Sequence, residues 1–459
     1  CAQGLYGLPP YSQGLAPRPF SSQVRSTLAM ATWYGSAECK TVSSSGSYLR
    51  AFAVGCSNFS IQYNYQCASI AMAIMATHGD YYVTNPAKAD FPTAPWVQKT
   101  LLAVVFAGSV AGMLFMGILG DYLGHRRALL LTKALVVLGA LMCILLPEEA
   151  GDNFWTHLAL WRFVIGVGLG GAYPLTAAVA GGSDQVGKAF FWQTPGSVAP
   201  YVVALILVEL VPGQTGLQFR WVLGLGALPS LVALFASLPT DATDATDATL
   251  SRREDLMQGF REAFGCPELQ RRLLGTAGSW FLFDVAAYGT VVFTPHILSI
   301  FGDEQSLVTM ILHSILLLSF SIPATWLSVV ALPMLGAKKL NLYGFVLQAV
   351  LFTSFASSYS ILHESQKVLL TLLCAIYFGL NWGVCVSTYV LPVQVFPEEF
   401  RGTLHGVSAA SGKLGALVGA GLFPFLNAAG GVPAVMGLQA SVCGLGALLS
   451  YLCLPPSEA

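Results

Sequence analysis

Three side chains that could bind a charged solute recur every four residues inside an otherwise apolar stretch of the chain. They are Trp280, Asp284 and Tyr288, which an α-helix would place on one face, about 6 Å apart per turn. An ionisable group inside a membrane segment is costly, so Asp284 is a candidate functional residue by default. Its carboxyl group, between two aromatic rings, could exchange a proton. The structural alternative is an aspartate that is satisfied by a neighbouring helix or held in an ion pair.

A basic group lies equally deep in a second apolar stretch. Lys413 stands some ten residues, roughly 15 Å by helical rise, inside a predicted helix that begins near residue 404. From that depth its side chain would be strained if the ammonium group reached the membrane surface. A buried ammonium group needs an anion. That anion could be a solute, the Asp284 carboxylate, or each in turn.

Neutral polar side chains occur in three further apolar stretches. Gln193 and Asn381 carry amides that can donate to an oxyanion without a charge cost, although amides in membrane helices also hold helices together. Tyr173 follows a glycine-rich run at 166–171. Because this run is apolar and no strand precedes it, the pattern favours tight helix packing, with a kink at Pro174, over a dinucleotide-binding loop.

The elements that must position these residues are membrane helices. Of the 459 residues, 55% are hydrophobic and only 10% are charged, whereas soluble domains carry roughly 25% charged residues. Apolar runs long enough for the ~20 residues that cross a bilayer recur along the chain. We therefore predict an all-α membrane protein with about twelve transmembrane helices, at residues 52–77, 98–120, 128–147, 157–181, 187–211, 217–238, 275–300, 305–333, 340–358, 367–391, 404–427 and 432–454.

A polar stretch divides these helices into two sets of six. It contains three copies of Asp-Ala-Thr at 241–249 and is too poor in apolar residues to fold alone. Arginine and lysine residues gather in the loops on one side, which the positive-inside rule assigns to the cytosol together with the linker and both tails. The predicted organisation is an N-terminal tail (1–51), a six-helix half (52–238), a central linker (239–274), a second six-helix half (275–454) and a short tail (455–459).

Composition disfavours several classes of function. The formal net charge of -1 offers no basic surface for nucleic acid. The 10 cysteines are scattered without CxxC or Cys/His metal spacing, so no metal or other cofactor is expected. No Ser/His/Asp, metal or nucleophile set lies at one depth, so we do not expect an enzyme. Two six-helix halves joined by a cytosolic loop instead suggest a carrier that binds its solute near the membrane midplane.

The loop after the second predicted helix carries a pattern of glycines and charges. Gly117 and Gly124 would permit close helix approach and a tight turn, while Asp121 could cap a helix start and pair with an arginine across the interface. Such a latch would be closed in one state of a carrier and broken in the other. The alternative is that the arginines of the loop only set the topology. The candidate gating residues are Gly117, Asp121, Gly124, Arg126 and Arg127, with Arg401 in a related run at 397–402 of the second half.

This loop resembles the signature G-x-x-x-D-x-x-G-R-[RK] of the major facilitator superfamily, although His125 stands where arginine is commoner. Within that superfamily, the Trp280/Asp284/Tyr288 face and the run from Pro392 to Lys413 resemble the phosphate:proton symporters, or inorganic phosphate permeases. The resemblance implies a twelve-helix fold in two halves and import of inorganic phosphate with protons by alternating access. It also implies a plasma-membrane location.

The same resemblance implies the residues of the binding site. Phosphate would be held by Tyr173, Gln193, Trp280, Asp284, Tyr288 and Asn381, and Lys413 matches the buried lysine of the family. Asp284 would also carry the coupling proton.

The chain departs from the family where acids are expected. Ile61, Asn64 and Ala172 replace aspartates and Gln394 replaces a glutamate. If those acids carry protons in the family, this chain must couple through Asp284 alone, use Na⁺, or work without a coupling ion.

Other functions stay open at this point. They are a porter of another oxyanion, an organic phosphate or a sugar, and a phosphate receptor that does not transport. A sugar porter should show a Gln-Gln pair in the seventh helix, where this chain has the run from Trp280 to Tyr288.

Overall fold

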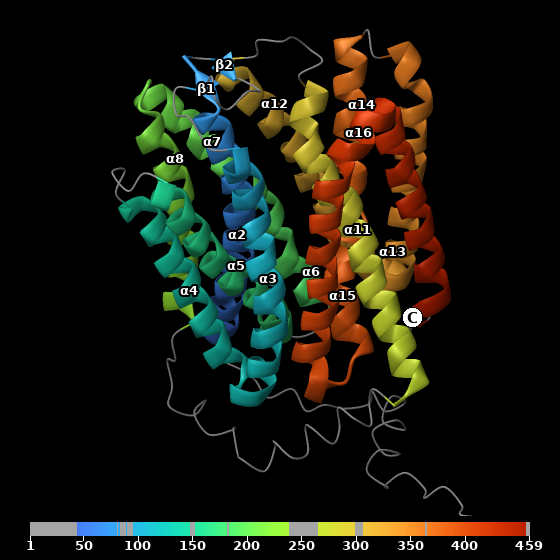
Figure 1. The fold of residues 1–459 in the computed structure, drawn as a ribbon. Helices are drawn as coiled ribbons and strands as arrows, with labels where there is room; N and C mark the ends of the chain where they lie inside the picture. Colours follow the sequence, from blue (N-terminus) through green and yellow to red (C-terminus); the bar gives the residue numbers. More distant parts are fainter. Residues whose placement is uncertain are drawn as a thin grey trace, which may run out of the picture. The chain divides into compact units, whose positions relative to one another are not determined.

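The computed structural model describes residues 44–79, 81–82, 89, 95–146, 152–180, 183–237, 265–298, 306–362 and 365–455. The prediction of an all-α protein is confirmed (Figure 1). The two named strands of the described residues, β1 (Thr77–His78) and β2 (Tyr81–Tyr82), form a short antiparallel hairpin. Residues Tyr48–Ala459 form one compact unit, which is described below. The Asp-Ala-Thr repeats and most of the predicted linker lie outside the described residues.

The helices of the first half match six membrane crossings. Four are single helices: α2 (Ser44–Met75), α3 (Pro95–Leu123), α4 (His125–Leu145) and α5 (Asp152–Ala180). The fifth and sixth crossings are each built from two consecutive helices: α6 (Ser183–Phe191) with α7 (Gln193–Leu210), and α8 (Thr215–Gly224) with α9 (Ala227–Ala236).

The second half also contains six crossings, because two of its long helices reverse direction at a glycine. Gly336 in α13 has φ 74° and Gly431 in α16 has φ 69°, a region that glycine tolerates and other residues avoid. The helices are α11 (Pro267–Leu298), α12 (Leu307–Ser319), α13 (Ser321–Leu362), α14 (Gln366–Asn381), α15 (Val384–Val395) and α16 (Arg401–Cys453), with a 3₁₀ turn, η6 (Glu398–Phe400), before α16. Within the described residues the predicted two sets of six are therefore present.

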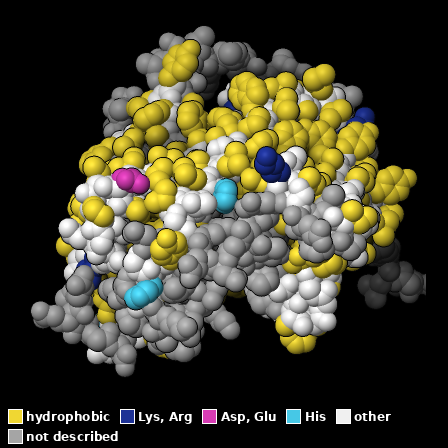
Figure 2. Space-filling model, turned by 90° about the horizontal axis from the view of Figure 1, so that it is seen from above, with side chains coloured by type: hydrophobic (Ala, Val, Ile, Leu, Met, Phe, Trp, Pro, Cys, Tyr) yellow, Lys and Arg dark blue, Asp and Glu magenta, His cyan; other side chains and the backbone are white. Residues whose placement is uncertain are grey.

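The outer surface of the helices suits a lipid environment. Nine segments of the described residues are long and apolar enough to cross a membrane, and one of them, Leu307–Tyr359, holds two crossings. Large side chains such as Phe115, Phe235 and Met334 are exposed. Figure 2 shows the molecule from above, along the helices, and apolar side chains are frequent among the coloured atoms of that end. The helices α2 and α11 fall outside the nine segments. Both carry polar side chains that line the interior cavity described below.

Helix ends differ from the apolar boundaries read from the sequence. Helix α2 begins at Ser44, before the predicted start at 52, and α11 begins at Pro267, before 275. Hydrophobicity marks the part of a helix that lies in lipid, whereas backbone hydrogen bonding continues into polar residues beyond it.

Glycines bring two helix pairs into backbone contact. A Cβ atom at Gly170 of α5 would collide with the Ser109 carbonyl of α3, and one at Gly415 of α16 would collide with the Phe281 carbonyl of α11. The glycine-rich run of α5 is thus a helix-packing surface, as predicted. Close packing of α11 on α16 fixes the relative position of the side chains that face the interior from these two helices.

Candidate functional site

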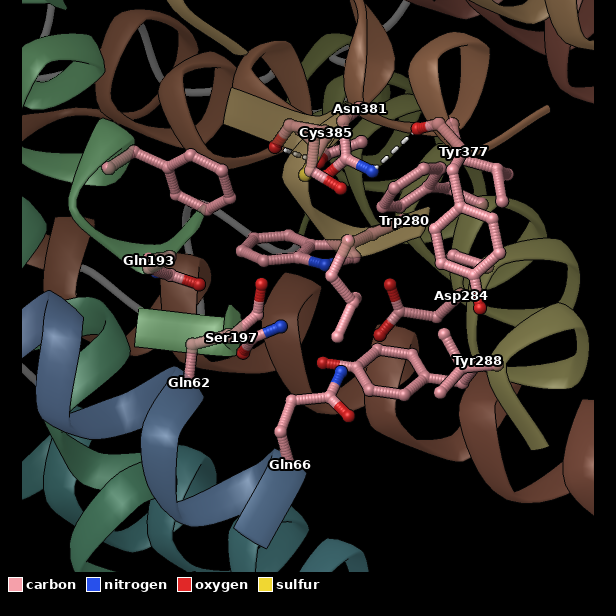
Figure 3. A pocket seen from close by; sticks show the side chains of 18 of the residues that line it. Gln62, Gln66, Gln193, Ser197, Trp280, Asp284, Tyr288, Tyr377, Asn381 and Cys385 are labelled. Atoms are coloured by element: carbon pink, nitrogen blue, oxygen red, sulfur yellow. Dashed lines mark hydrogen bonds between the residues drawn. The ribbon is translucent and has the colours of Figure 1, made fainter. Parts of the chain in front are cut away.

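One cavity lies between the two halves and is lined by both (Figure 3). Its volume is about 80 Å³. A water needs roughly 10–15 Å³ in the same measure, so the cavity can hold several waters or a small ion. All seven binding residues that the sequence suggested line this cavity: Tyr173, Gln193, Trp280, Asp284, Tyr288, Asn381 and Lys413.

A buried ion pair borders the cavity. The Lys413 ammonium group donates to the Asp284 carboxylate over 3.1 Å, and both side chains are 2% exposed. The same ammonium group donates to the Tyr288 hydroxyl over 2.8 Å and lies 4.1 Å from the centre of the Tyr288 ring. The ion pair was one alternative left open by the sequence. Because it sits on the cavity wall, it also leaves Lys413 within reach of a bound anion.

Aromatic rings form the wall of the cavity next to this pair. The Trp280 ring lies 6.1 Å from that of Tyr173 and 6.4 Å from that of Tyr389. His405 packs edge-on against both Trp280 and Tyr389, at 5.6 and 5.3 Å between ring centres. Trp280 and Tyr173 line the cavity, and Tyr389 and His405 pack behind them. We call the end of the bundle where α3 ends and α16 begins the basic end (lower end in Figure 1).

The polar residues of the first half form a hydrogen-bonded chain. The Tyr173 hydroxyl donates to the Gln193 carbonyl oxygen over 3.0 Å, and the Gln193 amide nitrogen donates to Asn58 over 2.8 Å. This chain connects α5, α7 and α2 and fixes the orientation of the Gln193 amide. Tyr173 and Gln193 are therefore held at the cavity edge before any solute binds.

Asn381 lines the cavity, but its side chain is bonded to its own helix. Its side-chain nitrogen donates to the Tyr377 carbonyl of its own helix over 2.9 Å. The residue ends α14 at a break in the tenth crossing, where Gly383 has φ 83°. Asn381 therefore lies on the cavity wall at the break between α14 and α15.

Sequence reasoning missed two glutamines on α2. Gln62 and Gln66 line the cavity, and both point towards Tyr288 and Asp284 in Figure 3. The Gln62 side chain faces the Tyr288 hydroxyl, and its carbonyl oxygen is buried with no hydrogen-bond partner. Their spacing of four residues, the same as that of Trp280, Asp284 and Tyr288, was the signal that could have found them.

The positions that lack the aspartates of the family lie in the packed first half. Ile61 and Ala172 are fully buried. The Asn64 amide donates to the Ser60 and Gly226 carbonyls over 2.9 and 3.1 Å, which joins α2 to the bend between α8 and α9. Asp284 is therefore the one carboxylate among the described residues that line the cavity.

The predicted gating residues gather at the basic end. Asp121 of the first half caps α16 of the second half: its carboxylate accepts hydrogen bonds from the Gly402 amide (3.2 Å) and from the Thr403 amide (2.7 Å) and hydroxyl (2.6 Å). The His125 ring also contacts Asp121, at 3.1 Å. A Cβ atom at Gly117 would lie 2.7 Å from the Gly402 carbonyl oxygen. The two halves are therefore in close contact at this end.

The remaining predicted gating residues lie around this contact. Gly124 forms the turn between α3 and α4 with φ 94°. Arg126 donates to the Ser237 carbonyl of its own half over 3.2 Å, and Arg127 is exposed at the start of α4. Arg401 lies 3.5 Å from Glu398 in the turn before α16.

Comparisons with known proteins agree with this architecture. The family model described as the Major Facilitator Superfamily matches residues 54–391. Inorganic phosphate transporter PT2 of Toxoplasma gondii is 35% identical over 410 residues, which cover 87% of this chain and 70% of that protein. The chain belongs to the phosphate permeases of the major facilitator superfamily.

Other proteins similar to this permease share less sequence identity with it. Inorganic phosphate transporter 1-1 of Arabidopsis thaliana is 28% identical over 466 residues, covering 85% of the permease described here and 88% of the plant protein. Among solved structures, the proton:xylose symporter XylE bound to 6-bromo-6-deoxy-D-glucose superposes with a TM-score of 0.73 at 16% identity, over 90% of this chain and 97% of XylE. That likeness shows the fold alone. As a member of a family of transporters, the permease is an integral multi-pass membrane protein and not an enzyme.

Proposed function

We propose that this permease imports inorganic phosphate by alternating access and couples import to protons through Asp284. The observation that carries the proposal is a small, buried cavity between the halves whose wall holds one ammonium group, Lys413, beside one carboxylate, Asp284. Relatives named inorganic phosphate transporters support phosphate as the anion. The plasma membrane is the proposed location, with the basic end facing the cytosol.

The ion pair suggests how a proton would control binding. When Asp284 carries a proton, it no longer competes with an anion for Lys413 and can itself donate to a phosphate oxygen. The Trp280 ring N–H and the second N–H of the Gln193 amide would supply further donors from the cavity wall, and the Tyr173 hydroxyl would become a donor when it gives up its bond to Gln193. When Asp284 loses its proton, the ion pair re-forms and displaces the anion. The carboxyl group thus interacts differently with the loaded and empty states, which coupling requires.

Protons are a better proposal than Na⁺ for the coupling ion. A single carboxylate that is already paired with an ammonium group gives Na⁺ little negative charge to bind. The Asp284 carboxyl needs no other charged partner to accept a proton.

Phosphate uptake with a change at Lys413 tests this proposal. In phosphate-transport-deficient cells, we expect wild-type uptake of radiolabelled phosphate to rise as the external pH falls from 8 to 5 and to be independent of Na⁺. Lys413→Ala should weaken phosphate binding roughly 10- to 100-fold, because a hydrogen bond to a charged group contributes about 1.5–3 kcal/mol. The matched control is Lys188→Ala, which removes an exposed lysine paired with Asp184 on α6.

Two outcomes would contradict the proposal. No phosphate uptake by correctly inserted wild-type protein at any pH would remove phosphate as the substrate, and sulfate and organic phosphates would be tested next. Uptake that requires Na⁺ would remove the proton as the coupling ion.

A second contact between the halves should also control access from the cytosol. The Tyr389 hydroxyl of α15 bonds to the Thr176 hydroxyl (2.7 Å) and the Tyr173 carbonyl (3.3 Å) of α5. Tyr389→Phe keeps the ring but removes both bonds, each worth about 1 kcal/mol, so we expect a roughly 30-fold shift towards the state open at the basic end. The rate at which an impermeant thiol reagent, added from the cytosolic side, labels a cysteine at Thr388 measures this shift. An unchanged labelling rate would show that the two bonds do not hold the gate.

A further inference from the structure

We propose that this carrier moves one proton with one phosphate monoanion, so that its transport cycle transfers no net charge across the membrane. The inference rests on the proposed function and adds the charged form of the substrate and the proton stoichiometry. The stoichiometry follows from the charged side chains on the cavity wall, which are one lysine and one aspartate.

The formal charges on the cavity wall are one positive and one negative. Among the described residues that line it, Lys413 and Asp284 are the only side chains of Lys, Arg, Asp or Glu. The first half contributes the neutral side chains of Gln62, Gln66 and Gln193. The wall is therefore neutral as a whole in the empty, unprotonated state.

The other titratable groups near Asp284 do not change this sum. Tyr173, Tyr288, Tyr377 and Cys385 lie on the cavity wall, and Tyr65 packs behind it; all are neutral in their protonated forms. On the side towards the basic end, His405 is buried beneath Trp280 and bonds through its ring to the Tyr389 carbonyl.

A further buried charge, Arg162, stays within the first half. Its guanidinium group is 1% exposed and donates to the Asn64 carbonyl over 2.8 Å. Arginine keeps its charge in proteins, so it contributes equally to the loaded and the empty carrier.

Only one loading keeps the cavity neutral. With a proton on Asp284, the single positive charge of Lys413 balances one monoanion, H₂PO₄⁻. The dianion with one proton, or the monoanion without a proton, would leave one negative charge in the cavity. Moving an uncompensated charge through a buried, low-dielectric site is costly. The loaded and the empty carrier are both neutral in the favoured cycle, so neither reorientation step should respond to the membrane potential.

A substitution at Gln62 should make the transport cycle move net charge across the membrane. It lies on the cavity wall opposite Tyr288, and its buried carbonyl oxygen has no hydrogen-bond partner. Gln62→Glu would add a second proton-binding carboxyl of the same length. The loaded variant would hold two protons and one monoanion and stay neutral, whereas the empty variant would return with one extra negative charge. Each cycle would then bring one net positive charge inwards.

The test uses the full-length protein in liposomes, in Na⁺-free buffer with inorganic phosphate and a fixed pH gradient. A K⁺ gradient with valinomycin sets the membrane potential to 0 or to about 100 mV, negative inside. Wild-type accumulation of phosphate should differ less than twofold between the two potentials. One elementary charge would change it by up to roughly 50-fold, which is the change expected for Gln62→Glu. The control, Gln62→Met, keeps the length without a carboxyl and should remain insensitive to potential.

The wild-type protein alone decides the question. Accumulation that rises many-fold at the negative potential would overturn the stoichiometry and leave the proposed function standing. Absence of phosphate uptake at both potentials would overturn the proposed function together with the stoichiometry.

Discussion

Replacing Asp284 by asparagine should lower proton-driven accumulation of phosphate at least 100-fold and abolish its dependence on external pH. The change leaves the Lys413 ammonium group buried without its counter-charge, and removal of one partner of a buried ion pair costs about 3–5 kcal/mol. Without the carboxylate no proton travels with phosphate, and the empty carrier would have to return with the Lys413 charge unpaired. Uptake from pH 5 to 8 at equal surface expression measures the effect.

Exchange of internal for external phosphate separates lost coupling from lost folding. Exchange does not require the empty carrier to return, so a folded Asp284→Asn protein should retain exchange while losing net accumulation. The matched control is Asp184→Asn, which changes a half-exposed aspartate on α6 and should leave both activities intact. Net uptake by Asp284→Asn that still rises in acid would rule out Asp284 as the coupling group.

Replacing Asp121 by alanine should open the basic end of the protein. The carboxylate accepts three hydrogen bonds from the start of α16, at Gly402 and Thr403. Because bonds to a charged group are worth about 1.5–3 kcal/mol and are not additive, we expect a loss of about 3 kcal/mol, or a roughly 100-fold shift of the equilibrium between closed and open states.

A distance between the two halves reports this shift. Spin labels at Leu123, which ends α3, and at Glu398, which lies before α16, are both on exposed side chains. We expect a short, narrow distance distribution in wild type and a longer, broader one in Asp121→Ala. Asp184→Ala serves as the control. An unchanged distribution in Asp121→Ala would mean that helix packing at Gly117, and not the cap, holds this end closed.

The sequence predicted which side chains line the cavity better than it predicted their contacts. The spacing of Trp280, Asp284 and Tyr288 is a property of one helix, so the common face follows from helical geometry alone. The ion pair joins residues 129 positions apart, and composition cannot say whether Lys413 faces Asp284 or a solute. That contact depends on the glycine-mediated packing of α11 on α16.

The gating loop illustrates the same limit. Its glycines and charges indicated a functional loop, but the partners of Asp121 are backbone amides 281 and 282 residues away. Backbone donors are present at every residue except proline and leave no trace in a sequence pattern. The glutamines of α2 were overlooked because an uncharged amide is not unusual in a membrane helix, although their spacing pointed to one face.

The packing of α11 against α16 has a consequence for the mechanics of transport. Gly415 and Gly419 of α16 bring the backbone into contact with Phe281 and Val285 of α11, and these neighbours hold Asp284 opposite Lys413. Both charges thus belong to the second half, and under the proposed alternating access α11 and α16 would keep their relative position while the two halves move. The second half would act as a preassembled binding module, and the first half as a moving cover that brings neutral donors to it. Anion selectivity could then change by substitutions in the first half without disturbing the proton chemistry of the second.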